Sequence, residues 1–106
     1  MYYFLAIFKG KETDIKIITE AKVIDEKNVS VPSHNYVKAL AEEIIELSHQ
    51  NNLFHNDIKS IALSIDNPEH IGYNSVASLK HDMTSTFGFE AIIDNDYEEL
   101  LVQLMK

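Results

Sequence analysis

An unbroken run of apolar residues, Tyr2 to Phe8 (YYFLAIF), lies near the start of the sequence. Its aromatic and branched side chains leave no regular polar position, so neither face of a strand built from it tolerates water. The run is also too short to cross a bilayer. It therefore predicts a strand near the centre of a sheet, covered by other elements on both faces.

Two more strands are predicted from the residues that follow. Lys9 to Asp14 forms a polar turn that contains a glycine, and Ile15 to Thr19 is again typical of a strand. Because the connection is short, we expect an antiparallel hairpin. A third strand is expected within Ala21 to Val31, on either side of a polar bend at Asp25 to Asn28.

A helix is predicted after Pro32, which ends the third strand. Ser33 or Asn35 can cap this helix, which should end near Gln50. The apolar residues of its inward face follow the three-and-four spacing of one helical side, and they are Val37, Leu40, Ala41, Ile44 and Leu47. Leu53 and Phe54 are expected to tuck under the helix.

The next predicted strand, Ile58 to Ile65, has large side chains on one face and small ones on the other. The large residues are Ile61, Leu63 and Ile65, and the small ones are Ser60, Ala62 and Ser64. A face of small residues allows a helix to lie close to the sheet. The strand should end at a turn formed by Asp66, Asn67 and Pro68.

A helix, a strand and a second helix are predicted for the rest of the chain. Ser75 can cap the first helix and Gly88 can end it, with Val76, Leu79 and Met83 on its inward face. Phe89 to Ile93 is expected to form the strand, and Asp94 to Asp96 the turn after it. The terminal helix is expected over Tyr97 to Met105, with inward residues Leu100, Leu101 and Leu104.

The predicted order is therefore strand, strand, strand, helix, strand, helix, strand, helix. Hairpin-linked strands followed by alternating helices and strands favour an α/β fold with a mixed five-stranded sheet and right-handed crossovers. A chain of 106 residues is long enough for one core. We expect residues 1–106 to form a single domain.

Charge and cysteine content exclude several classes of function. The chain has 17 acidic and 9 basic side chains, a formal net charge of −8, which repels nucleic acid and anionic lipid. We therefore expect no direct contact with nucleic acid or membrane. The absence of cysteine excludes disulfides, thiolate metal sites and thiol nucleophiles. Together with the lack of a signal-peptide pattern, it favours a cytoplasmic location.

Three stretches of the sequence carry a resemblance to a known family. They are LAIFKGKETDIKI, IKSIALSID and SLKHDMTSTFGFEAIIDNDYEELL. Together with the order of elements, they resemble the N-terminal lobe of the ROK family (repressors, open reading frames and sugar kinases). The resemblance implies the ribonuclease-H-like fold of actin-like ATPases. It covers nearly the whole chain but about half of a usual family member, which implies a degenerate, single-lobed relative.

The sequence departs from the family where phosphate should bind. Family kinases place an acidic residue and a Gly-Gly-Thr turn after the first strand, whose backbone N–H groups hold metal-bound phosphates. Here Phe8 takes the acidic position, and only Gly10 and Thr13 match the turn. The family's glycine-bearing loop after the fourth strand is replaced by Asp66-Asn67-Pro68. These departures predict a chain without nucleotide-dependent kinase activity and without a cofactor.

Asn95 and Asp96 match, by the same resemblance, a pair that holds a sugar and removes a proton from its hydroxyl. Such a carboxylate lies at the carboxyl end of a strand, where ligands of these sheets bind. In another interpretation, Asp96 and Glu99 form a capping box for the last helix. The two roles are compatible. The expected ligand-binding residues for a small sugar are Asn95, Asp96, Gly10 and Thr13, with Asp96 as the vestigial catalytic candidate.

The histidines and the acidic residues offer weaker signals. His70, with Glu69 or His81, is the most metal-like combination, but it lacks an established ligand spacing, and we expect no metal site. Two acidic clusters are expected, one of Glu42, Glu43 and Glu46, the other of Asp94, Asp96, Glu98 and Glu99. They are solvated surfaces, or they face a basic protein.

Three functions are consistent with these features. The first is a non-catalytic relative of ROK sugar kinases and NagC-like transcriptional regulators, acting as a regulatory or ligand-sensing interaction module. Such a module is expected to bind a protein partner or a second copy of itself. The alternative is a small acidic inhibitor or immunity-type protein that binds a basic protein partner. The third is an enzyme that requires a second lobe supplied by another chain.

Overall fold

The structure, a computed structural model, describes residues 1–20 and 22–104, without the side chains of Tyr97, Leu101 and Leu104. Within these residues the α/β fold predicted from the sequence is confirmed. The elements are, in order, β1 (Tyr2–Phe8), β2 (Thr13–Thr19), β3 (Lys22–Val29), α1 (Tyr36–Gln50), the short 3₁₀ helix η1 (His55–Asp57), β4 (Ile58–Ser64), a second 3₁₀ helix η2 (Pro68–Ile71), α2 (Val76–Phe87), β5 (Glu90–Asp94) and α3 (Tyr97–Leu104).

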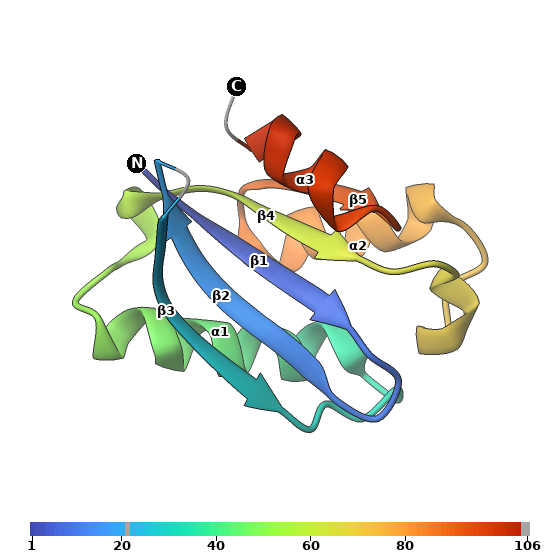
Figure 1. The fold of residues 1–106 in the computed structure, drawn as a ribbon. Helices are drawn as coiled ribbons and strands as arrows, with labels where there is room; N and C mark the ends of the chain where they lie inside the picture. Colours follow the sequence, from blue (N-terminus) through green and yellow to red (C-terminus); the bar gives the residue numbers. More distant parts are fainter. Residues whose placement is uncertain (21, 105–106) are drawn as a thin grey trace.

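β1 is the central strand of the sheet, as its composition predicts. Among the described residues the strands follow the order β3-β2-β1-β4-β5, and β1 pairs antiparallel with β2 and parallel with β4. Figure 1 shows β1 between these two neighbours. Phe4, Leu5 and Ala6 in the middle of the strand are all buried. Adjacent residues point to opposite faces of a strand, so both faces of β1 are covered.

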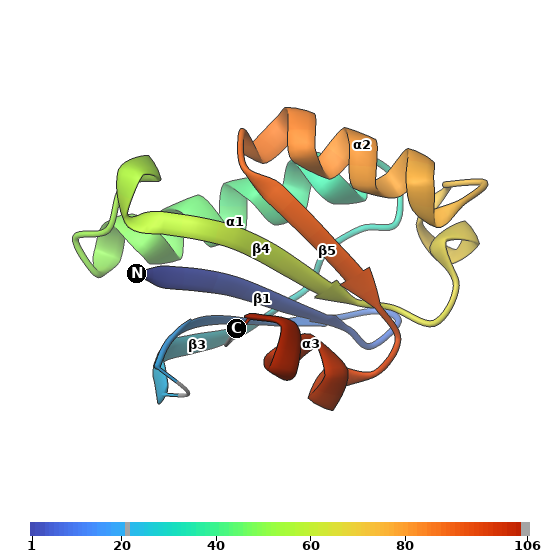
Figure 2. The same ribbon diagram turned by 90° about the horizontal axis from the view of Figure 1, so that it is seen from above.

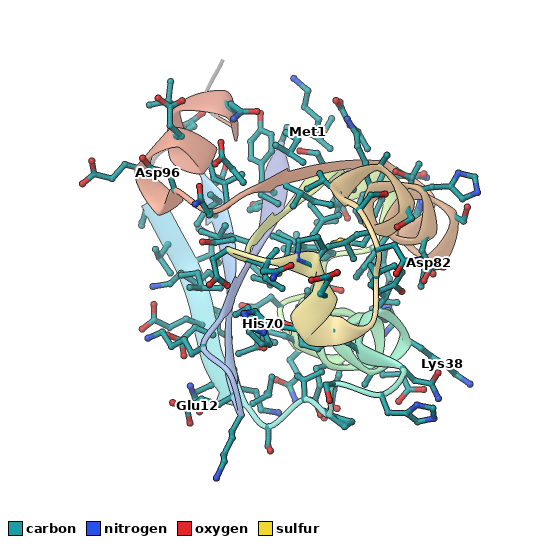
Figure 3. The ribbon with its side chains drawn as sticks, turned by 90° about the vertical axis from the view of Figure 1, so that its right-hand side faces the viewer. Met1, Glu12, Lys38, His70, Asp82 and Asp96 are labelled. Atoms are coloured by element: carbon teal, nitrogen blue, oxygen red, sulfur yellow. The ribbon has the colours of Figure 1, made fainter. Side chains whose placement is uncertain are left out.

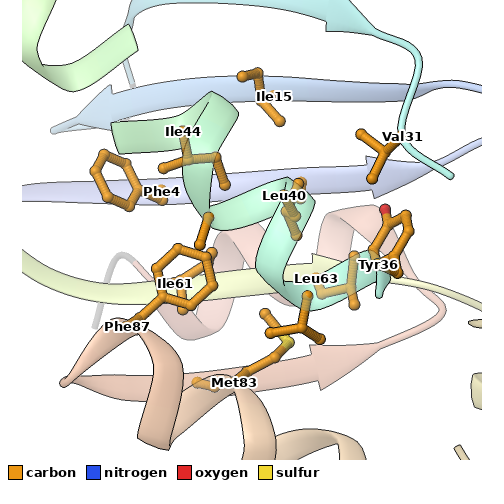
Figure 4. Packing of buried hydrophobic residues seen from close by; sticks show 14 of the residues in the cluster. Phe4, Ile15, Val31, Tyr36, Leu40, Ile44, Ile61, Leu63, Met83 and Phe87 are labelled. Atoms are coloured by element: carbon orange, nitrogen blue, oxygen red, sulfur yellow. The ribbon is translucent and has the colours of Figure 1, made fainter. Parts of the chain in front are cut away.

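Helices cover both faces of the sheet. α1 and α2 lie on one side and α3 on the other, as Figure 2 shows from above. The main core fills the space between the sheet and the α1–α2 layer and includes Phe4, Leu40 and Met83 (Figure 4). A smaller core beneath α3 contains Leu5, Ile18, Ala62 and Leu100.

The two-faced pattern of β4 explains how α3 reaches the sheet. Ile61 and Leu63 point into the main core, whereas Ala62 points into the smaller core with Leu100. The short side chain of Ala62 leaves room for Leu100, which is fully buried. The expectations for Leu101, Leu104 and Met105 lie outside the described residues.

The bend predicted inside the third strand is wrong. Asp25 to Asn28 belong to β3 and pair with β2. The register shifts where Ile17 opposes Asp25 and Ile18 opposes Val23, which leaves Ile24 as an extra residue. β3 is an edge strand with mostly exposed side chains, so polar residues do not interrupt it, and a bulge accommodates the extra residue.

Two apolar side chains that were expected inside the core are exposed. Val76 is exposed at the first position of α2, whereas Leu79 and Met83 on the same helix are buried as predicted. Leu53 is also buried as predicted, but Phe54 is 57% exposed. A periodic pattern assigns a residue to a face of an element, and it does not say whether another element reaches that end.

The two ends of α2 follow the signals in the sequence, whereas the start of α1 does not. The Ser75 hydroxyl oxygen accepts a hydrogen bond of 3.1 Å from the Ser78 N–H at the start of α2. Gly88 ends this helix with a φ of +80°, a conformation that favours glycine. Asn35 takes the N-cap position of α1, but its side chain makes no capping hydrogen bond.

None of the helices in the described ranges is both long and apolar enough to cross a membrane.

Candidate functional site

The candidate site lies where the parallel strands β1, β4 and β5 end. Ligands of open α/β sheets usually bind beyond these carboxyl ends. A cavity of about 580 Å³ opens there, and its lining includes Phe8, Gly10, Ser64, Asp66, His70 and Asn95. Figure 3 looks onto this end of the molecule, with His70 near its middle, Glu12 in the hairpin turn and Asp96 at the start of α3.

Aromatic rings form one wall of the cavity. The ring of Phe8 stacks on the imidazole of His70, with centroids 5.8 Å apart and an angle of 16° between the planes. The ring of Phe8 also meets the ring of Tyr36 nearly edge-on, with centroids 5.8 Å apart. His70 Nε2 lies 3.5 Å from Asp66 Oδ1. The last residue of β1 thus places an aromatic ring in the cavity wall, and the histidine stacked on this ring lies beside a carboxylate.

The lysine at the rim of the cavity is already paired. Lys9 Nζ lies 2.7 Å from Asp14 Oδ2, and the Asn28 side-chain amide donates a 2.6 Å hydrogen bond to Asp14 Oδ1. The bond to Asp14 raises the pKa of Lys9, and the bonds from Lys9 and Asn28 lower the pKa of Asp14. This ammonium group already has a carboxylate partner, so a phosphate would have to compete with Asp14 for it.

The glycine at position 10, on the rim of the cavity, is explained by its backbone conformation. Its φ is +90°, and a Cβ added to it would meet no atom within 4 Å. The hairpin turn is closed by the Lys9 N–H, which donates a 2.9 Å hydrogen bond to the carbonyl of Glu12. Glycine is thus favoured here by the positive φ of the turn, since nothing approaches it closely.

Thr13 is placed inside the protein, away from the cavity. It is 0% exposed, and its hydroxyl lies 2.6 Å from the Tyr36 hydroxyl. This contact ties the start of β2 to the first residue of α1. The structure therefore leaves Thr13 no surface for a ligand. Burial raises the pKa of Tyr36 to about 12, despite the hydrogen bond between Tyr36 and Thr13, which acts in the opposite direction.

The raised pKa of Tyr36 predicts a loss of stability in alkali. An unfolded tyrosine ionises near pH 10, whereas the folded protein keeps Tyr36 neutral up to about pH 12. Between these values the unfolded state binds fewer protons, so the free energy of unfolding should fall by roughly 1 kcal/mol per pH unit. Urea titrations at pH 9 and pH 11 measure this loss. It should be smaller in Tyr36→Phe, and an equal loss in both proteins would contradict the assignment.

Asn95 and Asp96 have separate positions. Asn95 lines the cavity, whereas Asp96 caps α3, with its Oδ1 accepting hydrogen bonds from the N–H groups of Glu98 (2.9 Å) and Glu99 (3.3 Å). The capping role predicted for Asp96 is confirmed. The Asp96 N–H donates to Asp94 Oδ1 at 3.2 Å, so Asp94 takes the place expected for Glu99 in the capping box.

Sequence reasoning missed part of the site. Asp66 and Ser64 were assigned only to a turn and a strand face, and His70 only to a weak metal pattern. Their common signal is position, because each lies at or after the carboxyl end of β4. Within the described part of the chain, no three His, Asp or Glu side chains are grouped so as to hold a metal ion.

Comparison with known sequences gives no relative for this chain. No protein-family model matches it, and no curated protein matches it.

Comparison with solved structures places the chain among actin-like ATPase folds. It is similar to the ROK hexokinase from Thermus thermophilus (TM-score 0.73, 12% identity), with 89% of this chain aligned to 34% of that one. It is also similar to Lmo2764, a putative N-acetylmannosamine kinase from Listeria monocytogenes (TM-score 0.63, 15% identity, 97% and 38% of the two chains). A third similar structure is a Bacteroides thetaiotaomicron protein with actin-like ATPase fold and unknown function (TM-score 0.61, 8% identity, 99% and 37%).

These similarities confirm the fold that the resemblance implies. At such low identity they concern the fold alone. The chain spans less than half the length of each of the three structures.

Proposed function

We propose that this chain is a non-catalytic relative of the ROK sugar kinases that binds a small sugar in the cavity beyond β1, β4 and β5. In this proposal it acts as a regulatory or ligand-sensing interaction module, as a NagC-like regulator does. The observation that carries the proposal is the cavity itself, which combines an aromatic wall with polar side chains at the usual ligand position of the fold.

The chemistry of the cavity favours a sugar over a nucleotide. The stacked rings of Phe8 and His70 line the cavity and offer aromatic contacts to the apolar face of a sugar ring. Asp66 and Asn95 provide hydrogen-bond acceptors and donors for hydroxyl groups. A volume of about 580 Å³ is within the range of small-molecule sites.

The same cavity is poorly equipped for phosphoryl transfer. That reaction requires metal-bound phosphates, held by cations and free backbone N–H groups, and a carboxylate that activates the attacking hydroxyl. Here Lys9 is paired with Asp14, and Phe8 is where the resemblance places an acidic residue. The Asp96 carboxylate accepts two backbone hydrogen bonds at the start of α3. These contacts support binding without catalysis.

Calorimetry with sugars tests the proposal. We expect heat on titration with glucose or N-acetylmannosamine, the sugars suggested by the named hexokinase and putative N-acetylmannosamine kinase. Asp66→Asn should weaken the binding about tenfold, because it removes a charged hydrogen-bond acceptor from the cavity. Asp96→Asn makes the same chemical change at the helix cap. It should leave binding unchanged, since asparagine caps as well as aspartate.

Three results would contradict the proposal. The absence of heat with every sugar would remove the ligand-sensing role. Formation of ADP from ATP in the presence of a sugar would show that the chain is an enzyme. Loss of binding in Asp96→Asn, with the stability unchanged, would move the sugar site from Asp66 to Asp96.

A further inference from the structure

A second cavity lies at the opposite end of the sheet from the sugar site. It measures about 240 Å³ and is bordered by the start of β4, the residues before it and the last turns of α1 and α2. Its walls are mainly apolar, with four phenylalanines, Phe4, Phe54, Phe87 and Phe89. None of these residues lines the cavity beyond β1, β4 and β5.

The aromatic walls are packed into a fixed arrangement. The ring centroid of Phe89 lies 5.9 Å from that of Phe4, 5.8 Å from that of Phe87 and 5.4 Å from the imidazole of His55. Phe4 and Phe87 are buried members of the main core. The floor of the cavity is therefore part of the folded core and is present before any ligand arrives.

Two exposed apolar side chains border the cavity. Phe54 is the more exposed of them, and Ile45 on α1 is 42% exposed. The backbone of Phe54 is held by Asp57, whose Oδ2 accepts a 2.9 Å hydrogen bond from the Phe54 N–H and whose own N–H donates to the Phe54 carbonyl at 2.8 Å. Exposed apolar groups beside an apolar cavity mark a contact surface.

Unpaired acidic residues continue this surface along α1. A shallow hollow next to the cavity shares Ile45 and His49 with it and is also lined by Glu42 and Glu46. Glu43 lies 3.5 Å from Lys27, but within the described residues neither Glu42 nor Glu46 forms an ion pair. The negative end of the α1 dipole lies at the same place.

We propose that these residues, Glu42, Ile45, Glu46 and Phe54 around the 240 Å³ cavity, form a docking surface for a basic segment of another protein. An apolar side chain of that segment enters the cavity, and lysines or arginines beside it face Glu42 and Glu46. Charge complementarity selects this occupant. A symmetric contact between two copies would bring the same acidic surface of each chain together, in chains that each carry −8.

A tryptophan-containing peptide tests the docking surface directly. The protein has no tryptophan, so tryptophan fluorescence reports only the peptide. At pH 8, where free imidazoles are neutral, the peptide Lys-Lys-Trp-Lys-Lys should bind with a blue shift of its emission. Glu-Glu-Trp-Glu-Glu and Lys-Lys-Ala-Lys-Lys should bind at least fivefold more weakly, the first by fluorescence and the second by competition.

Matched variants separate local recognition from net charge. Phe54→Ala and Glu42→Gln/Glu46→Gln should each weaken binding of the lysine peptide at least fivefold. Glu98→Gln/Glu99→Gln makes the same charge change on α3 and should have no such effect. An equal loss of affinity in both double variants would show that the peptide binds through net charge alone, and it would overturn the proposal. The proposal would also be wrong if Phe54→Ala had no effect on peptide binding, or if uncharged N-acetyltryptophanamide bound as tightly as the peptide. Binding of the lysine peptide does not depend on sugar binding, so either proposal can fail alone.

Discussion

Phe4→Ala and Leu5→Ala should each lower the free energy of unfolding by about 2–5 kcal/mol. The two residues are sequence neighbours on β1, but Phe4 belongs to the main core and Leu5 to the smaller core beneath α3. Both are almost completely buried. Each truncation removes apolar contacts and leaves a cavity. The two adjacent substitutions should therefore each destabilise the protein, one through the main core and the other through the smaller core. Only a strand covered on both faces behaves in this way.

Urea denaturation followed by circular dichroism measures these losses. Val23→Ala on β3 is the matched control, because it shortens an apolar side chain that is 42% exposed on an edge strand. We expect it to change the stability by less than about 0.5 kcal/mol. A loss below about 1 kcal/mol for Leu5→Ala would show that α3 does not form a second core.

Thr13→Val and Tyr36→Phe should each destabilise the protein by about 1–3 kcal/mol, and the double variant should be little worse than either. The two hydroxyl oxygens lie 2.6 Å apart in the protein, and each single change leaves one of them buried without its partner. The double change removes both hydroxyl groups, so no polar group remains unsatisfied. The difference between the sum and the double variant gives the coupling energy.

The Thr13–Tyr36 pair also affects the candidate site, because Tyr36 supports the wall of the cavity. Tyr36 contacts Phe8 edge-on, and Phe8 stacks on His70 in the cavity wall. Loss of the pair should therefore loosen the wall and weaken sugar binding as well as stability. Additive losses in the double variant would mean that the two hydroxyl groups do not act together.

Local patterns were enough to predict the elements and their order. The composition of Tyr2 to Phe8 predicts a strand covered on both faces, and the small side chains on one face of β4 predict that a helix can lie close there, where α3 is found. Caps and turns were equally accessible, since Ser75, Gly88 and Asp96 act on backbone groups within a few residues. Each of these signals depends on residues that are near one another in the chain.

The site was predicted only in part. Gly10 and Asn95 were expected to bind a ligand and do line one cavity, but Thr13 is buried by a residue 23 positions away in the sequence. The grouping of Phe8 with Asp66 and His70 was not foreseen, because it depends on the pairing of β1 with β4, which brings together segments far apart in the sequence. The exposure of Phe54 was not foreseen either.

The sequence alone thus determined the central strand, the order of the main elements and the caps of α2 and α3, because hydrophobic periodicity and capping act over one or two turns of chain. Only the tertiary structure decided that Thr13 is buried, that Asp66 and His70 share a cavity with Asn95, and that Ile45 and Phe54 border another. These outcomes depend on which strands become neighbours and on how far each helix reaches over the sheet. A local sequence pattern predicts neither of these features.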